Sequence, residues 1–361
     1  MIINSDNKIY FPALTGVRAV AAYMVYIHHY NPFSVATFGQ NVHDFFNEFH
    51  IGVTIFFVLS GFLICERYFD DKQFNFKQYF VRRFARIYPV YFILTTFTFL
   101  FFAVLHAKIG SVDFRDYLFN ISFIKGFLSD LKFTGIAQAW SLTVEELFYL
   151  FAPILFLLIK KGKIFLIIAP LFFIGLGLLL VTIFEDSNCY GFMNSINFML
   201  DFTFFGRVTE FFAGITAALI IKNYGFCFKY KIITALGFII IFLCICALVS
   251  LKIGNGYGVD TFSGKIINTI LLPIFGIAPL FIGLIGEQTL FSKFLSSKIM
   301  LMLGKSSYVF YLIHLGVFVN ILNKISTNQL FVFLSLNIIA IVLYKYLESP
   351  LNTFIRKKVG V

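Results

Sequence analysis

The amino-acid sequence predicts an all-α integral membrane protein, a polytopic bundle of about ten transmembrane helices. Hydrophobic residues make up 59% of the 361 residues and charged residues only 13%, whereas a soluble domain carries roughly 25% charged residues. The mean hydropathy is +0.87. The chain also holds 52 Phe residues, more than a water-facing surface can absorb. This composition excludes a disordered chain, a disulfide scaffold and an ordinary cytosolic enzyme.

Ten apolar runs have roughly the 20-residue length that a membrane span requires. They are uninterrupted, so they lack the alternation of an outer-membrane β-barrel. The connecting segments are short, and we therefore expect a single transmembrane domain over residues 1–361. The predicted spans are 11–30, 45–65, 87–106, 140–159, 164–184, 204–221, 232–251, 266–286, 301–322 and 330–347.

The distribution of Lys and Arg predicts the orientation. Ten spans place both termini on one side, and most basic residues fall in the loops that are cytoplasmic if the N-terminus is inside. We therefore expect an N-in and C-in topology. The same bias accounts for the net charge of +11 without a nucleic-acid partner. The five cysteines show neither metal-ligand spacing nor a disulfide framework, so no metal is predicted.

The first run contains three ionisable residues, which are costly within a membrane and therefore candidates for function. Helical geometry places Arg18 and His29 within about 20° of the same face, about 16 Å apart along the axis. His28 lies about 80° away from Arg18. We expect Arg18 and His29 to line one cavity. The alternatives are an interfacial histidine at a helix end and an arginine that snorkels to the membrane surface.

The second run ends in FFVLSG, where Ser60 allows close helix packing. The basic stretch that follows places Arg83 and Arg86 three residues apart, just before Pro89, whose position favours the start of a helix. Paired guanidinium groups suit a phosphate ligand, because they form bidentate hydrogen bonds. Contact with lipid headgroups is the alternative interpretation.

The later runs carry further polar residues. Glu145 and Tyr149 share a helix face, although acidic residues there also favour a helix start. Arg207 and Glu210, three residues apart, are expected to compensate each other's charge. Tyr308, Tyr311 and His314 form a polar stripe on a helix that otherwise faces lipid, where His314 has either a packing or a functional role. Glu348 and Pro350 predict a helix stop before the basic tail.

These blocks, taken in order, resemble the acyltransferase-3 family of bacterial integral-membrane O-acyltransferases. The resemblance begins with Arg18, ten residues, then His29, and it includes an Arg-x-x-Arg element on Arg83 and Arg86 and the Glu of a Ser-Leu-x-x-Glu element on Glu145. The further blocks are FFVLSGFLI at 56–64, RRFARIYPVY at 82–91, WSLTVEELFYL at 140–150, RVTEFFAG at 207–214, SSYVFYLIH at 306–314 and YLESP at 346–350.

The resemblance implies an enzyme of the bacterial cytoplasmic (inner) membrane. It would move an acyl group, usually acetyl, from acyl-CoA to a hydroxyl of a carbohydrate or glycolipid acceptor such as O-antigen, capsule or exopolysaccharide. The chain resembles the stand-alone form, without an appended esterase-like domain. The rival interpretation is a transporter or flippase for a lipid-linked sugar, which the composition fits equally well, whereas the ordered motif blocks favour the acyltransferase.

Within the family, His29 is expected to act as the general base or transient acyl carrier, because a histidine pKa lies near neutrality. Glu145 would orient it or accept a proton. Arg83 and Arg86 would hold the CoA phosphates, and Arg18 would extend this positive path or stabilise the oxyanion. The candidates for lining the acceptor path are Ser60, Tyr149, Tyr308 and His314.

Overall fold

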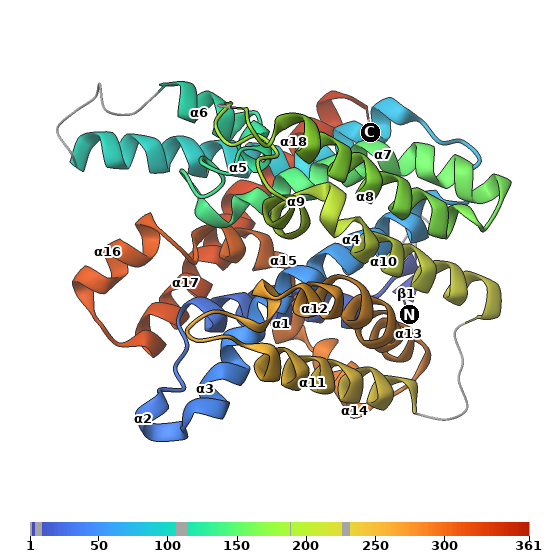
Figure 1. Cartoon of the computed structure of the whole chain (residues 1–361). Coiled ribbons are helices and arrows are strands. Elements are labelled where there is room, and N and C mark those ends of the chain that lie inside the picture. The colour runs from blue at the N-terminus through green and yellow to red at the C-terminus, as the bar shows by residue number, and fades with distance from the viewer. Residues whose placement is uncertain (1, 4–8, 106–113, 188, 226–231, 361) are drawn as a thin grey trace. The chain divides into compact units, whose positions relative to one another are not determined.

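The computed structural model describes residues 2–3, 9–105, 114–187, 189–225 and 232–360. The described chain is almost entirely helical (Figure 1). Its one sheet is a short antiparallel pair, β1 (Ile2–Ile3) with β2 (Ile9–Tyr10). The all-α fold class is thus confirmed, as is the multi-pass membrane class.

Every one of the ten predicted runs is largely helical. The helices are α1 (Pro12–His29), α2 (Val35–Phe38), α3 (Gln40–Asn47), η1 (Glu48–Ile51), α4 (Gly52–Tyr68), α5 (Phe76–Leu105), α6 (Phe114–Ile121), η3 (Ile124–Phe127), η4 (Ala137–Ala139), α7 (Trp140–Lys161), α8 (Phe165–Phe184), α9 (Ile196–Phe202), α10 (Phe204–Tyr224), α11 (Ile233–Leu251), η5 (Gly258–Asp260), α12 (Phe262–Ile266), η6 (Ile267–Ile277), α13 (Ala278–Gly286), α14 (Leu290–Leu295), α15 (Lys298–Ile313), α16 (Val317–Ile325), α17 (Gln329–Leu343), η7 (Tyr344–Glu348) and α18 (Ser349–Lys358).

Eight helical segments of the described chain are long and apolar enough to cross a membrane, or nine if α15 and α16 count as one span. Helix α1 is not among them, because Arg18, His28 and His29 lower its hydropathy. The predicted number of ten spans and the N-in, C-in orientation stay predictions.

Three local predictions were wrong. Pro89 does not begin a helix but lies inside α5, which starts at Phe76. A membrane helix tolerates such a proline, because neighbouring groups satisfy the freed carbonyl. The helix predicted to stop at Glu348 and Pro350 continues through the π-helical η7 into α18, where Pro350 occupies the first turn and needs no N–H donor.

The third wrong prediction is the single helix over 301–322. Helix α15 ends at Ile313, and α16 begins at Val317 after a bend of 91°. Gly316 between them has φ +78°, a conformation that other residues rarely adopt. The end of α15 does not face lipid as expected, since Val309, Phe310 and Ile313 are buried.

The described chain forms two compact units. Unit 1 comprises Met1–Asp71, Ile159–Pro170 and Arg207–Lys305, and unit 2 comprises Lys72–Leu158, Leu171–Gly206 and Ser306–Val361. The predicted single domain over 1–361 stays a prediction.

Unit 1 is held by close helix crossing and by a buried ion pair. A Cβ added at Gly61 of α4 would lie 2.1 Å from the carbonyl oxygen of Phe211 in α10, so only glycine permits this approach. On α10, Arg207 pairs with Glu210 at 2.7 Å, which confirms the predicted compensation. The Arg207 guanidinium also donates to Thr54 Oγ1 at 3.1 Å.

The described cysteines are all free thiols. They are Cys65, Cys189, Cys244 and Cys246. Cys227 lies outside the described residues.

Candidate active site

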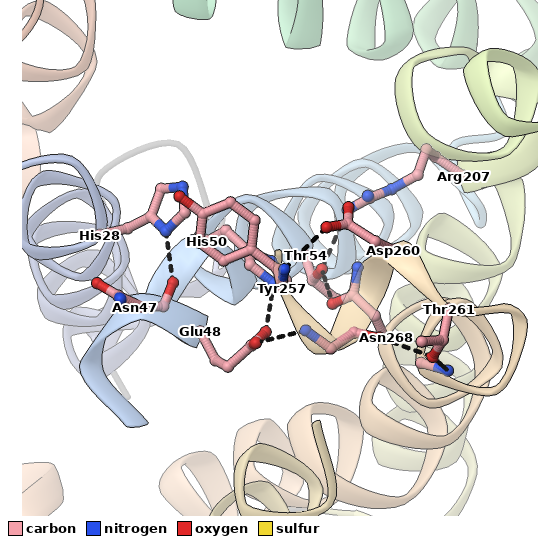
Figure 2. Close-up of polar contacts among 12 residues, drawn as sticks. His28, Asn47, Glu48, His50, Thr54, Arg207, Tyr257, Asp260, Thr261 and Asn268 are labelled. Atoms are coloured by element: carbon pink, nitrogen blue, oxygen red, sulfur yellow. Dashed lines mark hydrogen bonds and ion pairs between the residues drawn. The ribbon is translucent and has the colours of Figure 1, made fainter. Parts of the chain in front are cut away.

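The C-terminal end of α1 in unit 1 carries a group of aromatic and titratable side chains, which we call the histidine cluster: His28, His29, Glu48, His50 and Tyr257. The rings of His28 and His29 meet edge to face with centroids 4.7 Å apart. His28 also packs against His50 at 5.6 Å and against Tyr257 at 5.1 Å. Three chain segments, α1, η1 and the α11–α12 loop, thus converge here (Figure 2).

Hydrogen bonds hold the histidine cluster in place. His28 Nδ1 lies 2.5 Å from the carbonyl oxygen of Asn47. His50 Nε2 lies 2.9 Å from Glu48 Oε2, and the backbone N–H of Gly258 donates to Glu48 Oε1 at 2.7 Å. Figure 2 shows the Glu48 carboxylate between η1 and the Tyr257 loop.

An ion pair and a further hydrogen bond fix the loop that carries Tyr257. Lys252 Nζ lies 2.5 Å from Asp44 Oδ1, and the N–H of Tyr257 donates to Asp260 Oδ2 at 2.8 Å. The Tyr257 ring is therefore presented to the histidines by a loop that is anchored on both sides.

The two α1 candidates share one uninterrupted helix from Pro12 to His29. His29 is exposed at its end and Arg18 is half-buried two turns from its start. The helix keeps the predicted facing of Arg18 and His29, because a continuous α-helix preserves the 100° step per residue. Ser60 is half-buried on α4, beside the close contact at Gly61.

Unit 2 brings together Arg83, Glu145 and Tyr149. The Tyr149 hydroxyl donates to the Glu145 carboxylate, so the predicted shared face is confirmed. The Arg83 guanidinium lies over the Tyr149 ring, 5.6 Å from its centroid. Tyr79 donates its hydroxyl to the Tyr149 carbonyl at 2.9 Å. These contacts place a buried guanidinium over the ring of a tyrosine whose hydroxyl binds the Glu145 carboxylate.

Arg86 and Tyr308 belong to the same part of unit 2. The Tyr308 hydroxyl donates to the Ile87 carbonyl at 2.7 Å, which joins α15 to α5 one residue after Arg86. Arg86 also interacts electrostatically with Glu348, which is buried at the end of η7. Each arginine of the Arg-x-x-Arg element thus interacts with an acidic side chain, Arg83 with Glu146 of α7 and Arg86 with Glu348 of η7.

His314 is fully buried just beyond the end of α15. Its Nδ1 lies 2.7 Å from the Tyr311 carbonyl, and its ring stacks on Phe310 with centroids 6.2 Å apart. Tyr311 is tied to Ser141 at the start of α7 by a 2.9 Å hydroxyl–hydroxyl hydrogen bond. His314 therefore marks the packed junction of α15 and α7.

The predicted site residues fall into the two units. Unit 1 holds Arg18, His29 and Ser60, and unit 2 holds Arg83, Arg86, Glu145, Tyr149, Tyr308 and His314. The predicted partnership of Glu145 with His29 stays a prediction, whereas Glu48 is a carboxylate that belongs to the histidine cluster itself.

Sequence reasoning missed Glu48, His50 and Tyr257. The available signal was a Glu-x-His pair inside the predicted span 45–65, where ionisable residues are costly. Tyr257 had no such signal, because its place depends on a loop that lies about 200 residues further along the chain.

The chain matches a family model and is similar to several curated proteins. A family model described as "Acyltransferase domain" matches residues 11–345. A provisionally named O-acetyltransferase of Staphylococcus aureus (strain COL) is 27% identical over 376 aligned positions, which cover 94% of this chain and 57% of the relative. O-acetyltransferase OatA of S. aureus (strain NCTC 8325 / PS 47) is 26% identical, with 97% of this chain and 58% of OatA covered.

The chain thus spans somewhat more than half the length of these curated relatives. No solved structure gives a significant match to the chain.

Proposed function

The chain belongs to the acyltransferase-3 family, and on that premise we propose that it is an O-acetyltransferase of the bacterial cytoplasmic membrane. It moves an acetyl group from acetyl-CoA to a hydroxyl of a cell-surface carbohydrate or glycolipid. The observation that carries the proposal is the match of the family model to residues 11–345, which include all nine candidate site residues. The names of the S. aureus relatives support O-acetyl transfer.

The donor end of the site is assigned to Arg83 and Arg86. CoA carries several phosphate charges, and guanidinium groups bind phosphate in a bidentate manner. Arg83 is held by the Tyr149 ring, so its side chain is ordered before an anion binds, which lowers the entropic cost of binding. Both arginines lie in the N-terminal half of the 30-residue helix α5.

The chemistry is assigned to His29. Its imidazole takes the proton of the acceptor hydroxyl, and the hydroxyl oxygen bonds to the thioester carbonyl carbon. The carbon–sulfur bond then breaks, the thiolate of CoA takes the proton from the imidazolium, and the imidazole is restored. Oxidation states do not change. Arg18, on the same face of α1 but about 16 Å away along the helix axis, extends the positive path for the donor.

In an alternative form of the same step, His29 carries the acetyl group before it reaches the acceptor. The remaining candidates have supporting roles in the proposal. Glu145 orients the base or accepts a proton. Ser60, Tyr149, Tyr308 and His314 line the path of the acceptor.

A thiol-release measurement tests this function against the transporter interpretation. The purified chain in lipid nanodiscs is mixed with acetyl-CoA, and free CoA thiol is followed before and after addition of p-nitrophenyl hexosides as surrogate acceptors. An acetyltransferase releases thiol in step with acetylated hexoside. A transporter or flippase releases none, and that result would replace the proposal.

A further inference from the structure

Glu48 and His50 form a hydrogen-bonded carboxylate–imidazole pair at the base of the histidine cluster. The side chain of Glu48 is 1% exposed, and that of His50 is 17% exposed. Both carboxylate oxygens are engaged, one by His50 Nε2 at 2.9 Å and the other by the Gly258 N–H at 2.7 Å. A carboxylate buried this deeply is costly without compensating partners. The pair therefore holds the His50 ring in one orientation.

The oriented ring of His50 in turn confines His28. The two rings meet at an interplanar angle of 88° with centroids 5.6 Å apart. The Tyr257 ring packs against the His28 ring, with centroids 5.1 Å apart. The Asn47 carbonyl oxygen lies 2.5 Å from His28 Nδ1, within hydrogen-bond distance. His28 is thus fixed by three neighbours from η1, the end of α3 and the α11–α12 loop (Figure 2).

His28 is also the neighbour of His29, the imidazole to which the proposed function assigns the proton transfer. Their rings meet at 61° with centroids 4.7 Å apart. A continuous row therefore runs from the buried Glu48 carboxylate through His50 and His28 to His29 at the exposed end of α1. A general base must hold its lone pair toward the reacting hydroxyl, and a misplacement of about 1 Å can cost a hundredfold in rate.

We propose that Glu48 and His50 are positioning residues for the imidazole base: the carboxylate fixes His50, His50 confines His28, and His28 orients the ring of His29. This inference rests on the proposed function. In this proposal Glu48 and His50 act through His28, so their contribution is to the rate of the chemical step and not to the binding of acetyl-CoA.

The experiment measures kcat and the KM for acetyl-CoA in nanodiscs, with p-nitrophenyl hexosides as acceptors. Glu48→Gln keeps an oxygen for the Gly258 N–H but removes the charge that binds His50. We expect kcat to fall about ten- to a hundredfold, with KM changed less than twofold. Glu48→Asp, which restores the carboxylate, should recover part of the loss.

His50→Phe is the second variant and serves if Glu48→Gln folds poorly. It keeps a ring against His28 but loses the hydrogen bond to Glu48. Glu185→Gln is the matched control: it makes the same glutamate-to-glutamine change at an exposed residue just after α8, in unit 2. We expect its kcat to equal that of the wild type. Activity is expressed per folded molecule, measured by size-exclusion chromatography and thermal melting.

Wild-type kcat per folded molecule in both Glu48→Gln and His50→Phe would overturn the inference, as would an equal loss in Glu185→Gln. Two other results would show instead that the proposed function is wrong. In one, the wild-type chain releases no thiol; in the other, His29→Ala keeps wild-type turnover. If His29→Ala is inactive while Glu48→Gln is fully active, only the positioning role is lost.

Discussion

At the scale of single residues, Glu287 and Lys125 show two ways in which hydrogen bonds compensate a buried charged group. The Glu287 carboxylate accepts the N–H groups of Ile233 and Thr234 at 2.7 and 2.9 Å, at the positive end of α11. Lys125 is fully buried and donates to the carbonyls of Thr134 and Ile136, each at 2.7 Å. Carbonyl dipoles compensate its charge only in part, and burial lowers the pKa of Lys125 to about 7.

The lowered pKa predicts that stability rises with pH. In the folded chain Lys125 loses its proton near pH 7, whereas the unfolded chain keeps it up to the ordinary value of 10.5. Between these values the unfolded chain binds more protons, so a rise in pH favours the folded state by at most about 1.4 kcal/mol per unit. Below pH 7 both states are protonated and the full cost of burial applies.

We therefore expect the melting temperature of the solubilised protein to rise between pH 7 and 9, and to rise less in Lys125→Met. Lys324→Met, which removes an exposed lysine, serves as the control and should keep the wild-type response. Identical pH responses of Lys125→Met and the wild type would contradict the assignment.

At the scale of elements, hydropathy predicted where the helices lie but not where they break. Each apolar run became a helix, because a span must satisfy its own backbone hydrogen bonds. The break after Ile313 has only Gly316 as a sequence signal. Pro89, a residue type that usually ends a helix, lies inside α5. Hydrogen bonds between distant segments, such as that from the Gly258 N–H to Glu48, cannot be predicted from hydrophobic periodicity either.

The same limit applies to the candidate site. The shared face of Glu145 and Tyr149 followed from helical spacing, since both residues lie on one helix. The histidine cluster did not, because it joins α1, η1 and a loop between α11 and α12. The spacing of residues in the sequence predicts which side chains share a face of one helix, but it does not predict contacts between different elements.

The crossing of α4 and α10 gives a prediction at this scale. An added Cβ at Gly61 would lie 2.1 Å from the Phe211 carbonyl oxygen, so Gly61→Ala must push the helices apart. Overpacking of this kind costs about 1–3 kcal/mol, and we expect a lower melting temperature and less folded protein. Gly175→Ala in α8 is the matched control, since no atom lies within 4 Å of its added Cβ. Equal melting temperatures for the two variants would refute the tight crossing.

At the scale of the whole molecule, the candidate residues are divided between the two units. The predicted base belongs to unit 1, and the predicted donor-binding arginines belong to unit 2. Variants in one unit should therefore separate binding from chemistry: changes at Arg83 and Arg86 affect the acetyl-CoA affinity, and changes at His29 affect the transfer.

The donor assignment is tested by the double variant Arg83→Ala with Arg86→Ala. Loss of two guanidinium–phosphate contacts should weaken acetyl-CoA binding at least tenfold, because charge-assisted hydrogen bonds contribute about 1.5–3 kcal/mol each. Equilibrium binding of acetyl-CoA in nanodiscs measures the effect. Arg115→Ala, which removes an exposed arginine that stacks on Tyr190, should bind like the wild type. An unchanged affinity in the double variant would remove the arginines from the donor site.

The most direct test of the central claim follows the acetyl group itself. The chain in liposomes receives acetyl-CoA labelled in the acetyl carbon together with p-nitrophenyl hexosides, and the label bound to the hexoside is counted for the wild type and His29→Ala. We predict labelled ester with the wild type and a loss of about a hundredfold or more in His29→Ala, with acetyl-CoA binding retained. Transfer at the wild-type rate by His29→Ala would contradict the account.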